Sequence, residues 1–225
     1  MKMEKGLIIT IDGPSGVGKS TVAKSVAKHL GLTYLDTGAM YRAIALQVKR
    51  NPLNIDNDDE LSSLLLNTNI EFINNKENNL ILTLNNEDIT DKIRSPEISR
   101  LSSDIATKRI VRKKLVEIQR KIGSNGNIVV EGRDMGTYVF PGADFKFYLD
   151  ATLEERAKRR RNQLIETGHN IGADNMIKEI ELRDKQDKER LESPLHPAPN
   201  AVIIDTTNLI ADEVINRIIT GVKGE

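Results

Sequence analysis

The sequence predicts an α/β fold in which a central parallel sheet is flanked by helices, and three features indicate it. A glycine-rich loop at residues 13–20 follows an apolar run at 7–11 and precedes a helical pattern. Short apolar runs then alternate with helical patterns, as in parallel sheets that are covered on both faces. A hairpin pattern at 70–84 interrupts this alternation, so we expect a small inserted domain there.

The glycine-rich loop matches the pattern G-x-x-x-x-G-K-[ST] at every position, with the sequence Gly13-Pro14-Ser15-Gly16-Val17-Gly18-Lys19-Ser20. Its glycines reach positive φ at low cost and leave the backbone amides uncovered, so the loop can cradle a polyphosphate at a helix N-terminus. Lys19 adds a positive charge, and Ser20 offers a hydroxyl to Mg²⁺. The alternative is a glycine-rich turn that matches by chance, and the strand before it and the helix after it disfavour that interpretation.

The helix after the loop is supported by apolar residues at every fourth position and by Gly31 as a stop. Three further strands of the parallel sheet are expected at 127–130, 145–149 and 202–204. The insertion should be an antiparallel hairpin, with strands at 70–73 and 80–84 and a turn at 74–79. Ser95-Pro96 then predicts a helix start, and the apolar spacing predicts one helix that continues to Gly123.

Composition excludes several classes of function. Lysine plus arginine and aspartate plus glutamate both number 33, so no net field attracts the chain to nucleic acid or to an anionic membrane. The chain has no cysteine, which excludes disulfides, thiolate zinc sites and cysteine nucleophiles. The apolar run at 7–11 is too short for a signal peptide or a membrane span, so we expect a soluble cytoplasmic protein.

Two segments are candidates for the site of a second substrate. The first is Asp36-Thr37-Gly38-Ala39-Met40-Tyr41-Arg42, which offers a hydroxyl, a glycine for close approach and an arginine that can bind phosphate with two hydrogen bonds. A capped helix start with a solvated arginine explains this segment equally well. The second is Glu131-Gly132-Arg133-Asp134-Met135-Gly136, which follows the strand at 127–130. Ligands of open α/β sheets bind at the carboxyl ends of the strands, so Arg133 and Asp134 should emerge beside the loop, although they could also form a structural ion pair.

Two charged helical segments are ambiguous. Arg183, Asp187 and Arg190 lie on one face of a helix around 179–192, a spacing that a surface salt-bridge ladder explains better than a binding site. A second helix opens with a predicted capping box, Thr152 with Glu155. Its arginines would form either a mobile lid over phosphates or a solvated basic face; they are Arg156, Arg159, Arg160 and Arg161.

In combination, these segments resemble the bacterial cytidylate kinases over nearly the whole chain. The phosphate loop is generic, whereas the Tyr41-Arg42 and Gly132-Arg133-Asp134 motifs are more specific. The resemblance implies a three-layer nucleoside-monophosphate kinase fold with a core (about 1–60, 104–152 and 194–225), a monophosphate-binding insert (about 61–103) and a helical lid (about 153–193). It also implies a monomer that transfers a phosphoryl group from ATP to CMP or dCMP with Mg²⁺.

The same resemblance implies roles for single residues. ATP would be bound by residues 13–20 and Thr21, and Mg²⁺ would be held through Ser20. Lys19, Arg133, Arg159 and Arg160 would neutralise the transferring phosphate, a reaction that needs alignment more than a strong base. Arg42 and Arg133 would hold the CMP phosphate, with Thr37 and Tyr41 nearby; Ser103, Arg112 and Asp134 would read the cytosine. Arg183 and Asp187 would contact the ribose, and Arg190 would approach the phosphates. Glu131 stands where relatives have aspartate.

Two alternatives stay open from the residues alone. A kinase of another small acceptor, such as UMP, AMP or shikimate, would use the same phosphate loop. A nucleotide-binding regulator of the GTPase type should carry D-x-x-G and N-K-x-D motifs; the first does not occur, and the segment at 75–78 lacks the aspartate of the second.

Overall fold

The computed structural model describes residues 6–74, 80–169 and 171–224. The chain divides into two compact units, which are described separately. The first consists of Met1–Asp36 and Arg120–Glu225, and the second of Thr37–Gln119. The predicted division into core, insert and lid stays a prediction.

The first unit contains a five-stranded sheet in the order β2-β6-β1-β7-β8, with every neighbouring pair parallel. Its strands are β1 (Ile8–Asp12), β2 (Thr33–Asp36), β6 (Ile128–Gly132), β7 (Phe145–Asp150) and β8 (Val202–Asp205). The parallel sheet and four of its strands are therefore confirmed, and β2 is an additional edge strand. The register pairs Asp12 with Gly132 and Asp36 with Glu131, so polar residues gather where the strands end.

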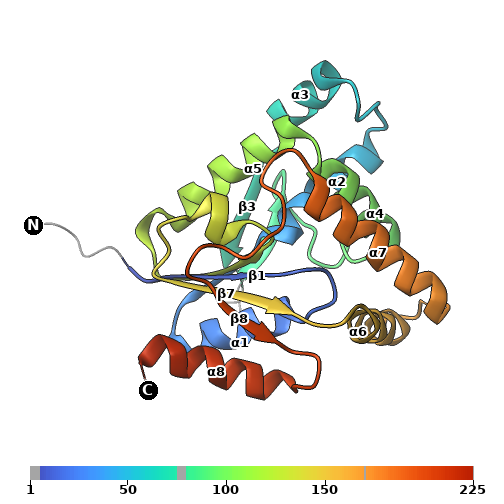
Figure 1. Cartoon of the computed structure of the whole chain (residues 1–225). Coiled ribbons are helices and arrows are strands. Elements are labelled where there is room, and N and C mark those ends of the chain that lie inside the picture. Colours follow the sequence, from blue (N-terminus) through green and yellow to red (C-terminus); the bar gives the residue numbers. More distant parts are fainter. Residues whose placement is uncertain (1–5, 75–79, 170, 225) are drawn as a thin grey trace, which may run out of the picture. The chain divides into compact units, whose positions relative to one another are not determined.

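The helices of the first unit are α1 (Lys19–Leu30), α6 (Leu153–Glu166), α7 (Ala173–Glu189) and α8 (Ala211–Lys223). Figure 1 shows α1 and α8 on the same face of the sheet. Val22 and Val26 of α1 share a buried cluster with Val214 and Ile218 of α8, because these apolar residues recur at helical spacing. Short helical segments follow α5 and β6, at Gly123–Asn125 (η1) and Met135–Val139 (η2, a π-helix).

The second unit has its own core and its own sheet. Its elements are α2 (Thr37–Arg50), α3 (Asp58–Leu66), β3 (Ile70–Asn74), β4 (Leu80–Leu84), β5 (Glu87–Asp88), α4 (Pro96–Ala106) and α5 (Arg109–Ile122), which runs past the end of the unit. Met40, Ile44 and Leu61 are buried together with Leu84 and Ile98. The antiparallel hairpin is confirmed, and residues 75–79 of its predicted turn lie outside the described residues. Strand β5 adds a third strand to it.

The single helix expected from Ser95 to Gly123 is wrong, because the segment forms two helices. Its N-terminal cap is confirmed, since the Ser95 hydroxyl accepts the N–H of Ile98. Helix α4 ends at Ala106, where the Thr107 hydroxyl donates to the carbonyl of Asp104 at 2.7 Å and competes with the helical pattern. The interval of six residues between Ile105 and Val111 fits no helical repeat, and this was a signal of the break.

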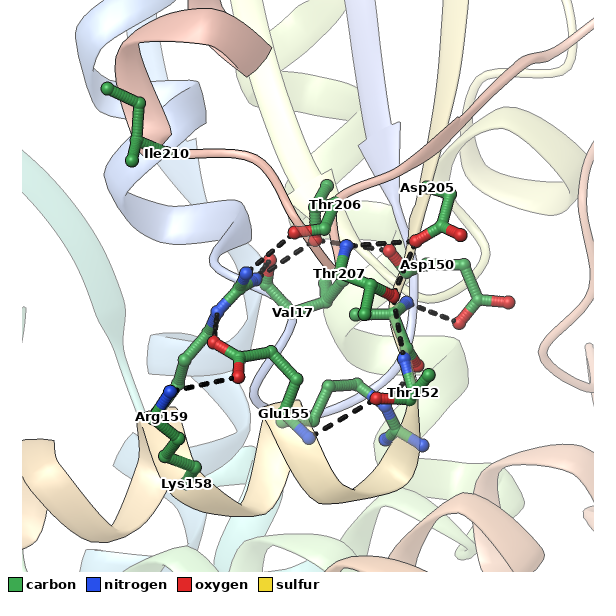
Figure 2. Close-up of polar contacts among 12 residues, drawn as sticks. Val17, Asp150, Thr152, Glu155, Lys158, Arg159, Asp205, Thr206, Thr207 and Ile210 are labelled. Atoms are coloured by element: carbon green, nitrogen blue, oxygen red, sulfur yellow. Dashed lines mark hydrogen bonds and ion pairs between the residues drawn. The ribbon is translucent and has the colours of Figure 1, made fainter.

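The predicted capping box of α6 is half correct. The Thr152 hydroxyl accepts the N–H of Glu155 at 3.4 Å, which confirms the cap. The Thr152 N–H donates instead to the hydroxyl of Thr207, and the Glu155 carboxylate forms ion pairs with Lys158 and Arg159 (Figure 2). Lys158 and Arg159 of α6 thus bind the carboxylate that a capping box would have used. Among the described helices, none combines the length and the apolar character that a membrane span needs.

Candidate active site

The phosphate loop lies between β1 and α1, as its motif predicted. Gly13, Gly16 and Gly18 adopt φ values of 149°, 79° and 96°, in the region that favours glycine. A Cβ on Gly13 would lie 2.1 Å from the carbonyl oxygen of Leu149 in β7, and one on Gly16 would lie 2.7 Å from the carbonyl oxygen of Arg156. The loop therefore needs glycine both for its conformation and for its close contacts.

Lys19 is nearly buried at the start of α1, with 6 % of its surface exposed. Its Nζ donates a 2.7 Å hydrogen bond to the carbonyl of Pro14 across the loop. Burial and the positive charge of Arg133 lower the pKa of Lys19 well below its usual value. Two cations near one buried site favour a bound anion, and a phosphate between them would relieve their repulsion.

The carboxyl ends of β2 and β6 bring oxygen atoms together near Ser20. Glu131 is buried, and burial and the negative charge of Asp36 raise its pKa. Its carboxylate accepts a 2.5 Å hydrogen bond from Tyr34, and Ser20 also bonds to it. Two carboxylates that repel each other beside a hydroxyl fit Mg²⁺, which prefers oxygen ligands and keeps waters and substrate phosphates in its shell. Within the described residues, no three or more histidine, cysteine, aspartate or glutamate side chains are grouped so that they could hold a metal ion.

The structure joins the Gly132-Arg133-Asp134 motif to α7. The Arg133 Nε donates to Asp187 Oδ2 at 2.7 Å, and Arg190 Nη2 lies 3.3 Å from Asp134 Oδ1. Arg190 Nη1 also lies 3.9 Å from Asp187 Oδ1. Burial alone would raise the pKa of Asp187, but Arg133, Arg183 and Arg190 lower it below its usual range. These residues form one buried network, so the simple surface ladder on α7 is not what the structure shows.

The remaining predicted substrate residues belong to the second unit. Tyr41 and Arg112 meet there, because Arg112 Nη1 donates to the Tyr41 hydroxyl at 3.2 Å. Thr37 is buried at the first position of α2, Arg42 is half-buried on the same helix, and Ser103 is half-buried on α4. Their roles in CMP binding stay predictions.

The arginines of α6 have different surroundings. Arg159 lies against the end of β8, with Nη1 at 3.0 Å from the Thr206 hydroxyl and Nη2 at 2.6 Å from the Thr206 carbonyl (Figure 2). Arg160 donates to Gln163 on its own helix at 2.7 Å, and Arg161 donates to the carbonyl of Ile171 at 3.0 Å. The catalytic roles of Arg159 and Arg160 stay predictions.

With this geometry in place, comparison with known proteins decides the family. The sequence model described as cytidylate kinase matches residues 9–224. The chain belongs to the cytidylate kinase family. This agrees with the resemblance inferred from the phosphate loop, the Tyr41-Arg42 motif and the Arg133-Asp134 motif.

Individual members of the cytidylate kinase family match the chain over nearly its full length. The cytidylate kinase of Geobacter sulfurreducens is 45 % identical over 95 % of this chain and 91 % of its own length. That of Bacillus subtilis is 43 % identical over 98 % of both chains. Among solved structures, an uncharacterized protein from Eubacterium ventriosum matches with a TM-score of 0.52 at 14 % identity, over 97 % of this chain and 99 % of its own, which supports the fold alone.

Asp12 borders the candidate site and was not predicted from the sequence. Its carboxylate accepts the backbone N–H groups of Met135 and Gly136 at 2.9 and 2.8 Å, and so fixes the turn directly after Asp134. Burial raises the pKa of Asp12 to about 6. An acidic residue at the end of an apolar strand was the available signal. Tyr34 was also missed, because only the register of β2 against β6 places it beside Glu131.

Proposed function

We propose that this protein transfers the γ-phosphoryl group of ATP to CMP or dCMP, giving ADP and CDP or dCDP. The observation that carries the proposal is the buried network of Arg133, Asp134, Asp187 and Arg190, which lies in the same unit as the phosphate loop. A family of kinases whose members are named for cytidylate supports the same reaction. The monomeric state that the resemblance implies and the cytoplasmic location expected from the N-terminal sequence belong to this proposal.

The donor nucleotide would bind through residues 13–21. Backbone amides of the loop and the N-terminus of α1 would hold the phosphates, and Lys19 would exchange its bond to the Pro14 carbonyl for the phosphate oxygens. Ser20, with Glu131 and Asp36 beside it, would hold Mg²⁺, which neutralises phosphate charge when it is bound. The lid arginines Arg159 and Arg160 would supply further positive charge.

The acceptor would bind beside this cradle. Arg133 would hold the phosphate of CMP, which then competes with Asp187 for the same guanidinium, and Asp187 becomes available to the ribose. Asp134 is an acceptor for the exocyclic amine of cytosine. That contact would discriminate against uracil, which has a carbonyl in place of the amine. By the family resemblance, Arg183 and Arg190 of α7 would also contact CMP. The same resemblance assigns CMP contacts to five residues that belong to the second unit, namely Thr37, Tyr41, Arg42, Ser103 and Arg112.

Such a site aligns two phosphates and neutralises their charge without a strong base. The test is ADP release with Mg-ATP and a panel of acceptors, namely CMP, dCMP, UMP, AMP, GMP and shikimate. Strong turnover of CMP and dCMP is expected. Turnover of another member alone would support a kinase of that acceptor, and ATP binding without turnover of any of them would support a regulator.

A further inference from the structure

Arg156 is a buried arginine at the start of α6 that the mechanism above does not use. Only 7 % of its side chain is exposed. Its Nε donates to the carbonyl of Ala151 at 3.0 Å, and its Nη2 forms an ion pair of 2.7 Å with Asp184 of α7. Its third bond is unusual for a residue that only joins two helices, because Nη1 donates at 3.1 Å to the carbonyl of Ser15 in the phosphate loop.

The bond to Ser15 sets the orientation of one peptide group in the loop. The described peptide bonds are all trans, so the carbonyl of Ser15 and the N–H of Gly16 point in opposite directions. A carbonyl held toward α6 therefore turns the Gly16 amide away from α6 and fixes its direction. A phosphate cradle depends on backbone amides whose directions are fixed.

The packing around Gly16 strengthens this relation. A Cβ on Gly16 would lie 2.7 Å from the carbonyl of Arg156, so the loop and the first turn of α6 are in direct contact. One turn later, Arg159 Nη1 lies 3.5 Å from the carbonyl of Val17, two residues after Ser15 in the loop (Figure 2). Two arginines of α6 thus face two carbonyls of the loop, those of Ser15 and Val17.

We propose that Arg156 is a positioning residue for the phosphates of ATP, and that it acts through the Ser15 carbonyl. Asp184 is the counter-ion that makes this possible, because it holds the guanidinium in place and balances its buried charge. The proposal rests on the proposed function in one respect, that the loop binds a nucleoside triphosphate. It assigns a role in substrate binding to a pair that otherwise only connects α6 to α7.

The test measures binding, in the absence of an acceptor reaction. Dissociation constants of ATP, of inorganic tripolyphosphate and of CMP are measured by calorimetry for the wild type and two variants. Arg156→Lys keeps the charge beside Asp184 but loses the forked guanidinium. The double variant Arg156→Gln with Asp184→Asn removes both charges together, so no buried charge is left unpaired if the single variant does not fold.

We expect both variants to bind ATP and tripolyphosphate about tenfold more weakly, as the loss of one oriented amide implies. Their affinity for CMP should change less than about twofold. Lys158→Gln is the matched control on the same helix, because its side chain is 69 % exposed, and it should leave all three constants unchanged. Unchanged affinity for ATP and tripolyphosphate in a folded variant would overturn the proposal. Equally weakened binding of CMP and ATP would also overturn it, and would indicate a general packing role for Arg156.

The two hypotheses can fail separately. A failure of CMP phosphorylation would appear in the turnover of the wild type, whereas the binding constants of ATP and tripolyphosphate require no acceptor. A lower melting temperature with unchanged binding would leave Arg156 as a purely structural residue.

Discussion

The hydroxyl of Tyr34 donates a 2.5 Å hydrogen bond to Oε1 of Glu131, and this bond joins β2 to β6 at the place proposed for Mg²⁺. Glu131 lies deep in the protein, close to Asp36, so its carboxylate depends on the few donors around it. The bond thus links the stability of the sheet edge to the orientation of a candidate metal-site oxygen.

Tyr34→Phe removes this donor, and with the same hydroxyl the bond between Tyr34 and Ser20. The free energy of unfolding should fall by about 1–3 kcal/mol, because a buried carboxylate loses a partner. The Mg²⁺ concentration for half-maximal rate should also rise. Urea unfolding and a Mg²⁺ titration of the rate measure the two effects. Tyr138→Phe is the control, since Tyr138 is 44 % exposed, and its change should stay within about 0.5 kcal/mol. Equal effects of the two substitutions would contradict the role of Tyr34.

Asp134→Ala should act on the acceptor far more than on the donor. The substitution removes the proposed acceptor for the cytosine amine and leaves Arg190 without its ion pair at 3.3 Å. We expect kcat/KM for CMP to fall about 100-fold or more, while the dissociation constant of ATP changes little. Steady-state kinetics with CMP and calorimetry with ATP measure this difference. An equal loss of both would indicate a structural or metal-linked role.

Asp12→Asn should change how stability depends on pH. Burial raises the pKa of Asp12 from 3.8 to about 6, so between these values the folded state holds a proton that the unfolded state has released. Asp12 therefore makes its whole contribution to the free energy of unfolding below about pH 4. This contribution falls as the pH rises and is lost above about pH 6. The shift corresponds to about 3 kcal/mol. The unfolding free energy of the wild type relative to the variant should fall by about this amount between pH 4 and pH 7. Parallel curves would show that Asp12 does not titrate in this range.

Gly13→Ala should be strongly destabilising, since its Cβ would lie 2.1 Å from the Leu149 carbonyl at a φ of 149°. We expect the free energy of unfolding to fall by at least about 2 kcal/mol, because neither backbone segment can move without disturbing β1 or β7. ATP binding should be lost as well. Gly142→Ala is a matched control, because no atom lies within 4 Å of its added Cβ. Thermal unfolding and ATP calorimetry compare the two. A stable Gly13→Ala protein that binds ATP would contradict the contact.

The sequence was informative where a local pattern determines the structure. The phosphate loop, four apolar strands and the hairpin were predicted, because glycine spacing and hydrophobic periodicity are local signals. The two-residue strand β5 carries no such signal, and the break after Ala106 lies inside a periodic segment where a threonine side chain competes with the helix.

The contacts of the candidate site were less predictable, because they depend on packing between distant segments. The motif around Arg133 indicated a binding residue, yet nothing in the chain order shows that Asp187 is its partner. Likewise, the pattern of α6 showed a basic helix but could not separate Arg156, which is buried, from Lys158, which is exposed. Register and tertiary packing decide these differences.

The position of Gly16 limits which substitutions homologous sequences can accept. The phosphate loop is usually regarded as a property of consecutive residues, but Gly16 is also constrained by the Arg156 carbonyl, far along the chain. Any side chain there meets a backbone atom, and shortening the side chain at 156 cannot make room for it. A substitution at position 16 and the position of α6 are therefore coupled. Homologues that lose this glycine should also show α6 displaced from the loop.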